Sequence, residues 1–202
     1  MRKIITTTFV TLDGVMQAPG GPEEDTSGGF VYGGWQAGWQ DDISGNIIQD
    51  FMTIPFEMLL GRRTYENFAG YWPNHPEIEL IAKPFNSTKK YVASHSSMEL
   101  SWNNSALVTG DVVKEIQKLK TLDAPDLWVW GSGNLIQTLL KNDLVDRMHI
   151  WTHPVTLGTG KKLFAEGTQP QNLKLVDSKI STRGVVFATY EPDGALKLGT
   201  MV

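Results

Sequence analysis

Two strand-like segments that each run directly into a glycine turn and a helix constrain the fold more than any other feature of this chain. The first spans Glu57 to Leu60 and leads through a glycine into a segment where Tyr65 and Phe68 lie one helical turn apart. The second is the apolar run Leu127 to Trp130, which leads into the glycine-containing turn 131–133 and a further helix. A strand followed at once by a helix returns the chain to a parallel neighbour, so both segments predict an α/β fold with a parallel sheet.

Further predicted elements follow the same alternation. The β-branched run Lys3 to Val10 predicts a first strand, which ends at the turn signal Asp13-Gly14. Apolar residues then recur at helical spacing from Asp41 until Pro55 stops the helix, with Asp41 or Asp42 as the N-terminal cap. The remaining predicted elements before the last third are strands at 90–93 and 106–109 and a helix opened by Asp111.

The last third of the chain changes character. Strands are expected at 144–156, 173–180 and 185–190, with no long helix between them, and Thr182-Arg183-Gly184 is typical of a hairpin turn. We therefore expect a mostly parallel central sheet with an antiparallel C-terminal strand. No repeat or linker divides the chain, so we expect residues 1–193 to form one domain and residues 194–202 to form a tail.

The segment 17–40 is predicted to be a long loop, because glycine and proline are too frequent in it for a helix or a strand. It also contains several large aromatic side chains, which disordered linkers seldom carry, so we expect it to pack over the domain. Trp35 and Trp39 in this loop, together with Trp72, could line a flat pocket for a heteroaromatic ring. The alternative is that these three tryptophans belong to the core.

Composition excludes several classes of protein. A net charge of −4 gives no basic surface for a nucleic acid, and no apolar run approaches the roughly 18 residues that span a bilayer. The absence of cysteine excludes disulfides, thiolate nucleophiles and cysteine-ligated zinc. The start of the chain leads straight into a strand with no signal-peptide core, so a cytoplasmic location is expected.

The turn Gly61-Arg62-Arg63-Thr64 is the strongest candidate for binding a phosphate. Unpaired N–H groups and the positive end of the helix dipole favour an anion at the start of a helix. Guanidinium groups bind phosphate in a bidentate manner, and an arginine near the ribose is suited to the 2′-phosphate that distinguishes NADP from NAD. The alternative is that the two arginines are solvated or pair with Glu57 or Glu66.

Gly131-Ser132-Gly133 is a second candidate, because two glycines at a strand-to-helix turn allow the backbone to approach a pyrophosphate. The turn lacks the third glycine of the dinucleotide fingerprint, and on its own it is also compatible with a simple tight turn. Both turns are expected at the same edge of one sheet, which is where ligands bind in open α/β folds.

Other polar residues offer weaker candidates. His149 and His153 lie in a strand-like segment, where four residues span about 13 Å, so we expect no metal site there. His95 is expected in a loop just beyond a strand, and no serine hydrolase motif is present. Among the acidic residues, Asp13 is either a turn former or a catalytic group beside a bound cofactor; the other acidic candidates are Asp42, Asp50 and Glu57.

Taken together, these motifs resemble the dihydrofolate reductase superfamily, and within it the reductase domain of the bifunctional riboflavin-biosynthesis deaminase/reductase. The resemblance implies a three-layer α/β fold and a cytoplasmic, homodimeric enzyme that transfers a hydride from NADPH to a pterin-like or pyrimidine-like heterocycle, as in 5-amino-6-(5-phosphoribosylamino)uracil reductase activity. The segments that carry it are Phe9–Gly14, Leu59–Glu66, Gly131–Leu135, Leu144–Asp146 and Pro154–Phe164.

The resemblance also implies roles for individual residues. Segment 11–16 resembles the loop that flanks the nicotinamide, and segment 158–164 resembles a motif near the substrate. The expected cofactor-binding residues are Gly61, Arg62, Arg63, Thr64, Ser94, Gly131, Ser132, Gly133, Asn134 and Leu135. The expected substrate-binding residues are Leu12, Gly14, Trp39, Gly160 and Lys161, with Asp13 as the candidate catalytic residue.

Two departures from the family pattern leave the acceptor open. The helix expected after segment 17–40 offers Asp42 or Asp50, but neither has the context of the acidic residue that protonates dihydrofolate. Segment 17–40 itself is extra relative to the family. The leading hypothesis is therefore an NADPH-dependent reductase without a defined acceptor; the alternatives are an NADP(H)-binding sensor or scaffold without turnover and an unrelated α/β domain that acts through protein contacts.

Overall fold

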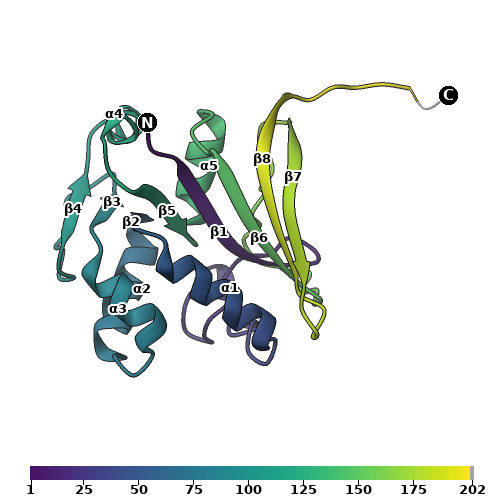
Figure 1. Cartoon of the computed structure of the whole chain (residues 1–202), viewed down its shortest axis with the longest axis horizontal. Coiled ribbons are helices and arrows are strands. Elements are labelled where there is room, and N and C mark those ends of the chain that lie inside the picture. Colours follow the sequence, from purple (N-terminus) through teal and green to yellow (C-terminus); the bar gives the residue numbers. More distant parts are fainter. Residues whose placement is uncertain (201–202) are drawn as a thin grey trace.

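The computed structural model describes residues 1–200 and has an α/β architecture (Figure 1). In its first part the elements are β1 (Ile4–Thr11), α1 (Asp42–Thr53), β2 (Phe56–Gly61), α2 (Arg62–Tyr71), α3 (Glu79–Ser87), β3 (Lys90–Ala93) and β4 (Ser105–Val108). The second part comprises α4 (Val112–Thr121), β5 (Asp126–Trp130), α5 (Gly133–Lys141), β6 (Arg147–His153), β7 (Gln171–Ile180) and β8 (Val186–Ala195). Short 3-10 turns lie at Ser27–Gly29 and Trp72–Asn74.

The eight strands form a single sheet in the order β4-β3-β2-β5-β1-β6-β8-β7. The neighbours from β4 through to β6 pair in parallel, whereas β8 is antiparallel to both β6 and β7. This confirms the predicted fold class, a mostly parallel sheet with an antiparallel C-terminal strand. The carboxyl ends of the central parallel strands consequently meet at one edge of the sheet.

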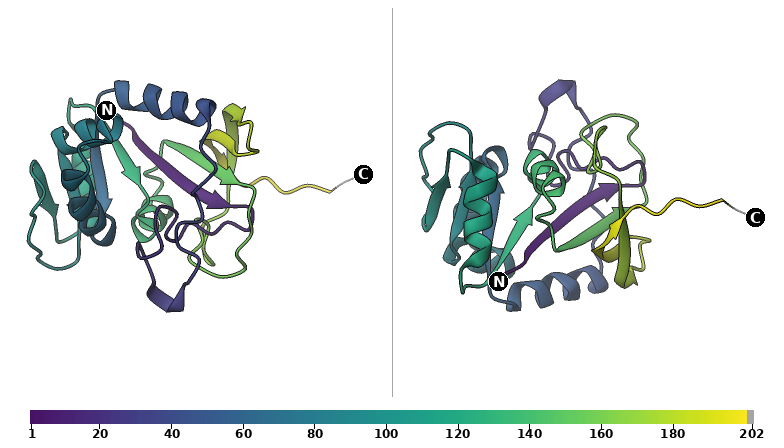
Figure 2. Two further views of the ribbon diagram at one scale, coloured as in Figure 1. Left: turned by 90° about the horizontal axis from the view of Figure 1, so that it is seen from below. Right: turned by 90° about the horizontal axis from the view of Figure 1, so that it is seen from above.

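Helices cover both faces of the sheet and make three layers (Figures 1 and 2). Successive side chains of a strand point to opposite faces, and the central strands carry apolar residues on both. On one face Leu59 and Leu127 pack in a cluster with α4 and α5. On the other face Leu60 and Trp128 pack in a cluster with α1, α2 and α3. Burial on both sides thus explains why the central strands are rich in apolar residues.

Helix α1 begins where the sequence places a cap. Asp41 is the capping residue: its carboxylate accepts a hydrogen bond from the Ser44 N–H, and the Ser44 hydroxyl accepts one from the Asp41 N–H. The same carboxylate also accepts hydrogen bonds from the N–H and hydroxyl of Thr182 in the turn between β7 and β8. Asp41 therefore fixes the start of α1 against the terminal hairpin.

Several elements differ from the sequence-based expectation. Helix α3 was not predicted; it contains the helix-breaking residue Pro84, yet Ala82 and Phe85 bury one face of it. Strand β6 spans Arg147–His153 and is shorter at both ends than the expected 144–156, whereas β7 begins at Gln171, two residues earlier than expected. Strand β8 extends to Ala195, which pairs with Gln171, so residues 194 and 195 lie in a strand and not in the expected tail.

The chain then leads away from the sheet after β8 (Figure 1). Within residues 1–200, no helix is sufficiently long and apolar to cross a membrane.

Strand β6 carries a buried histidine, His149, on the face covered by α1. Its Nδ1 lies 2.9 Å from the Thr189 hydroxyl of β8, and its ring contacts Phe51 of α1 with 4.6 Å between ring centroids. Burial, helped by the positive charge of Arg147, lowers the pKa of His149 to about 4. The native state therefore keeps this imidazole neutral at pH values where an unfolded chain would protonate it.

This histidine predicts an acid-sensitive fold. Between pH 6.5 and 4 the unfolded chain binds a proton at His149 that the native state does not, so the free energy of unfolding falls as the pH falls. We expect His149 to account for a loss of about 2 to 3 kcal/mol between pH 7 and pH 4.5. Urea unfolding at both pH values measures this loss in the native sequence and in His149→Gln; equal losses in the two proteins would contradict the prediction.

Candidate functional site

The two glycine turns of the parallel sheet lie side by side and are joined by hydrogen bonds. Strands β2 and β5 are parallel neighbours, so Gly61 and Ser132 lie at the same sheet edge. The Gly61 N–H donates to the Ser132 hydroxyl at 3.0 Å, and the Ser132 N–H donates to the Thr64 hydroxyl at 3.1 Å. The structure thus confirms that the two turns share one edge of the sheet, where hydrogen bonds join them.

The helices that begin at these turns have free N-terminal backbone groups. Neither Gly61, which precedes α2, nor Ser132, which precedes α5, makes a side-chain capping bond. By contrast, α1 and α4 are capped by the carboxylates of Asp41 and Asp111. Two uncapped helix starts side by side concentrate positive potential and N–H donors at this edge, an arrangement that suits a phosphate-bearing ligand.

The backbone of the second turn adopts an unusual conformation. Gly131 and Ser132 both have positive φ, 56° and 57°. A side chain on Gly133 would come within 3.1 Å of the Met16 sulfur, which packs against this turn. The third glycine of the dinucleotide fingerprint is absent, but the two that remain serve a left-handed turn and a close contact.

Arg62 extends toward the turn that follows β3. Its guanidinium donates to the Glu66 carboxylate at 2.9 Å and to the Ser96 hydroxyl at 2.9 Å. In the same turn the buried Ser94 donates to the Ser96 carbonyl, and His95 is exposed. The pairing of Arg62 with Glu66 is one of the alternatives considered from the sequence. Glu57, the other partner considered, pairs with Arg2 instead.

Arg63 extends in a different direction, toward segment 17–40. Its Nη1 lies 3.1 Å from the Asp25 carboxylate and 3.2 Å from the Ser27 hydroxyl. The two arginines therefore separate, one facing the turn after β3 and the other facing the loop. Asp25 and Ser96 are polar partners that sequence reasoning missed, since nothing in the local pattern indicates which distant residues they meet.

The segments expected near the nicotinamide and the substrate are also brought together. Val15 forms an antiparallel bridge with Lys162, and the Leu163 N–H donates to the Gly14 carbonyl at 3.0 Å. Gly160, with φ of 117°, fits closely against Val15: a side chain there would come within 2.7 Å of the valine. The predicted residues Gly14, Gly160 and Lys161 thus lie in two segments, 11–16 and 158–164, that are hydrogen-bonded to each other, and Leu12 is exposed.

Asp13 accepts hydrogen bonds that hold segment 11–16 against the start of segment 158–164. Its carboxylate accepts hydrogen bonds from the Thr11 hydroxyl and from the N–H groups of Leu157 and Gly158. The Thr11 hydroxyl is the main cause of a lowered pKa for Asp13. An ionised carboxylate with its oxygens committed to these donors is unsuited to protonating a substrate, and the turn-forming interpretation accounts for its position.

The tryptophans do not form one pocket wall. Trp72 belongs to the cluster beneath α2 and α3, where its ring meets Phe85 with centroids 5.2 Å apart. Trp39 packs in another cluster with α1, and its indole N–H donates to the Trp35 carbonyl. Trp35 donates to the Gln17 carbonyl and pins the loop internally. Segment 17–40 is a loop as predicted and is packed through these contacts.

The histidines of β6 have structural partners. His149 bonds Thr189, as described above, and His153 Nδ1 lies 3.0 Å from the Trp151 carbonyl. Both side chains lie on the strand, as the sequence indicates. Among the residues that the structure describes, no group of three or more histidine and acidic side chains is arranged to hold a metal ion.

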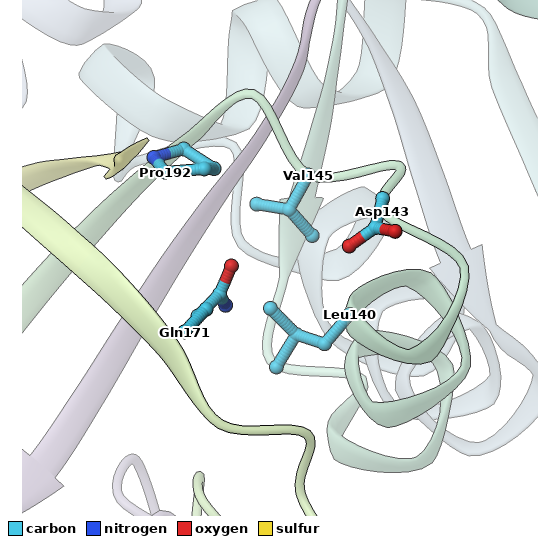
Figure 3. Close-up of a pocket in the computed structure, with 5 residues that line it drawn as sticks. All are labelled: Leu140, Asp143, Val145, Gln171 and Pro192. Atoms are coloured by element: carbon cyan, nitrogen blue, oxygen red, sulfur yellow. The ribbon is translucent and has the colours of Figure 1, made fainter. Parts of the chain in front are cut away.

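One small crevice lies away from the joined turns (Figure 3). It has a volume of about 50 Å³ and lies beyond the far end of α5, between that helix and the terminal strands. This volume is too small for a nucleotide or a heterocyclic substrate. Its lining residues are Leu140, Asp143, Val145, Gln171 and Pro192.

Three known proteins resemble this chain over nearly all of its length. An uncharacterized Bacillus subtilis (strain 168) protein, YyaP, is 31% identical over 200 residues, 96% of each chain. A pyrimidine reductase-like protein of Corynebacterium diphtheriae shares the fold with a TM-score of 0.64 at 11% identity, covering 95% of this chain and 92% of that one. A dihydrofolate reductase of Enterococcus faecalis, complexed with NADP(H), has a TM-score of 0.60 at 14% identity, covering 95% of this chain and 96% of that one.

The comparison with protein families identifies one family over most of the chain. Residues 2–187 match the family described as the RibD C-terminal domain. This match covers both glycine turns, segment 17–40 and the strands that support them. The chain therefore belongs to the RibD C-terminal domain family, and it shares the fold of a dihydrofolate reductase.

Proposed function

We propose that this protein is an NADPH-dependent reductase that transfers a hydride to a small pterin-like or pyrimidine-like heterocycle. The observation that carries the proposal is the pair of hydrogen-bonded turns from which two uncapped helices begin at one edge of the sheet. Membership of a reductase family supports it, as does the likeness to a dihydrofolate reductase complexed with NADP(H).

The residues at the turns fit the phosphates of such a cofactor. The N–H groups at the starts of α2 and α5 suit the pyrophosphate, with Gly61, Thr64 and Ser132 shaping the two turns. Arg62 donates a hydrogen bond to Ser96, and we propose that it binds the 2′-phosphate beside Ser94. The remaining proposed cofactor contacts are Arg63, Gly131, Gly133, Asn134 and Leu135.

When bound, NADPH supplies the hydride, and the protein has to position an acceptor and exclude water. The proposed substrate contacts are Leu12, Gly14, Trp39, Gly160 and Lys161. Among the buried polar groups on the α1 face of the sheet that have no hydrogen-bond partner are the hydroxyl of Thr7 and the indole N–H of Trp130, the last residue of β5, with which Thr7 is in register. Asp13 remains ionised, so we propose that a water molecule delivers the proton to the acceptor.

A second candidate function is NADP(H) binding without turnover. It is favoured by Asp13, the candidate catalytic residue, because its carboxylate accepts hydrogen bonds from Thr11, Leu157 and Gly158 and is unsuited to protonating an acceptor. A sensor or scaffold of this kind would bind the nucleotide and fail to oxidise it.

We also propose that the chain forms a homodimer through β7. This strand is the last of the sheet, and its side chains from Lys174 onward are exposed. Leu175 and Ile180 are 51% and 65% exposed, and edge strands with apolar side chains are commonly covered by a partner.

Turnover separates the two functions. The reductase is expected to oxidise NADPH, followed at 340 nm, when pterin, pyrimidine and simple carbonyl acceptors are supplied in turn. Saturable NADPH binding, without oxidation in the presence of any acceptor, would favour the sensor. Failure to bind either NADPH or NADH would contradict both functions and favour action through protein contacts.

Arg62 predicts the preference for NADPH. Replacing Arg62 with alanine removes a charged hydrogen bond of about 1.5 to 3 kcal/mol and should weaken NADPH binding roughly 10- to 150-fold, with NADH nearly unchanged. Quenching of tryptophan fluorescence in paired titrations measures both affinities. Arg183→Ala, an exposed arginine in the β7–β8 turn, is the control and should change neither affinity. A parallel loss for NADPH and NADH would argue against a 2′-phosphate contact.

The edge strand predicts the oligomeric state. Sedimentation equilibrium should give the mass of a dimer for the native protein and of a monomer for Ile180→Lys, because a charge desolvated in an apolar interface is costly. Lys197→Glu changes a charge after β8 and serves as the control. A native protein that sediments as a monomer would remove the dimer proposal and leave the proposed activity intact.

A further inference from the structure

Asp25 stands at the junction of three segments that are distant in the sequence. Its carboxylate accepts hydrogen bonds from Arg63 of α2 at 3.1 Å and from the Lys161 ammonium at 2.5 Å. It also accepts hydrogen bonds from the N–H and hydroxyl of Ser27 at 3.2 and 2.6 Å. A residue expected to bind cofactor and one expected to bind substrate thus meet at a single carboxylate.

The cationic partners are accessible although the carboxylate is not. The side chains of Arg63 and Lys161 are 58% and 46% exposed, whereas that of Asp25 is 14% exposed. Burial disfavours the charged form of Asp25, but the hydrogen bonds from Lys161 and Ser27 outweigh it and lower its pKa to about 2. The Asp25 carboxylate therefore pairs with Arg63 and Lys161 from the protein interior. A ligand could approach the same two side chains from solvent.

The backbone around Asp25 is held independently of the carboxylate. The buried Gln17 amide donates to the carbonyls of Asp25 and Ser27, at 2.9 and 3.0 Å, and accepts from the Lys161 N–H. Asn67 of α2 donates to the Glu24 carbonyl at 2.9 Å. Rotation of the Asp25 side chain would therefore free Arg63 and Lys161 while the loop stayed in place.

We propose that Arg63, Lys161 and the Ser27 hydroxyl form a phosphate-binding site whose internal occupant in this structure is the Asp25 carboxylate. A ligand phosphate would exchange with the carboxylate, since both are oxyanions that accept from guanidinium, ammonium and hydroxyl donors. This phosphate site deepens the proposed function. It rests on that function only for the side from which the ligand approaches Arg63 and Lys161. The phosphate can belong to the cofactor or to a phosphorylated acceptor.

Exchange with an internal anion lowers the apparent affinity for an external one, because only the fraction of molecules with free cations is competent to bind. Replacing Asp25 with asparagine keeps the size of the side chain and removes its charge. We expect Asp25→Asn to tighten binding by about 5- to 30-fold for a ligand whose phosphate enters this site. Glu23→Gln, an exposed carboxylate in the same loop, removes the same charge at a position without a partner and is the matched control.

Titration calorimetry with four probes tests the proposal and identifies the source of the phosphate. The probes are inorganic phosphate, ADP, adenosine 2′-monophosphate and ribose 5-phosphate. If Asp25→Asn gains affinity only for inorganic phosphate and an adenine nucleotide, the site is assigned to the cofactor. If it gains affinity only for inorganic phosphate and ribose 5-phosphate, the site is assigned to a phosphorylated acceptor. No gain beyond that of Glu23→Gln for any of the four probes would overturn the proposal.

A double variant separates anion exchange from a purely structural effect of Asp25. Asp25→Asn combined with Arg63→Ala should lose the gain, because the freed cation is then missing. A gain that persists without Arg63 would overturn the proposal. If the native protein reduces an acceptor while Asp25→Asn shows no gain, the phosphate site is wrong and the proposed function stands. If Asp25→Asn binds inorganic phosphate more tightly while no acceptor is reduced, the site stands and the proposed function fails.

Discussion

The hydrogen bonds of Ser132 with Gly61 and Thr64 join two turns that are about 70 residues apart in the sequence, and the rest of the site depends on this junction. Each turn exists because a buried strand leads directly into a helix. Alone, either turn would present one helix start to solvent. Because β2 and β5 are neighbours, the two starts lie together and their N–H groups face the same edge. The positive φ of Ser132 is a strained conformation that these two bonds help to maintain.

Segment 17–40 adds a second set of constraints to that edge. It contributes carboxylate and hydroxyl groups through Asp25 and Ser27, while Gln17 and Trp35 fix its backbone. Through Asp25 the loop neutralises Arg63, at the start of α2, and Lys161. Its polar contacts therefore couple Arg63 of α2 to Lys161, which the sequence separates by about one hundred residues.

Local sequence signals were sufficient to predict the mostly parallel sheet and the two glycine turns. Strand-to-helix junctions, apolar periodicity and capping aspartates report on neighbours along the chain, and the strands at 90–93 and 126–130 follow from them closely. Helix α3 was missed because a local breaker, Pro84, was outweighed by the burial of Phe85. The partners of Arg63 were missed for a different reason. An ion pair between residues 38 positions apart produces no periodic pattern in the sequence.

The face of the sheet beneath α1 contains polar groups that are buried at a cost in stability. Thr7 lies between Trp130 and His149 in the register of the three adjoining strands. Its hydroxyl and the Trp130 N–H are buried without partners, and each such group costs about 1 to 3 kcal/mol. Apolar residues of similar size would fill the same space without that cost. Under the proposed function, polar groups retained at this cost are suited to the ring nitrogens and carbonyls of a heterocyclic acceptor.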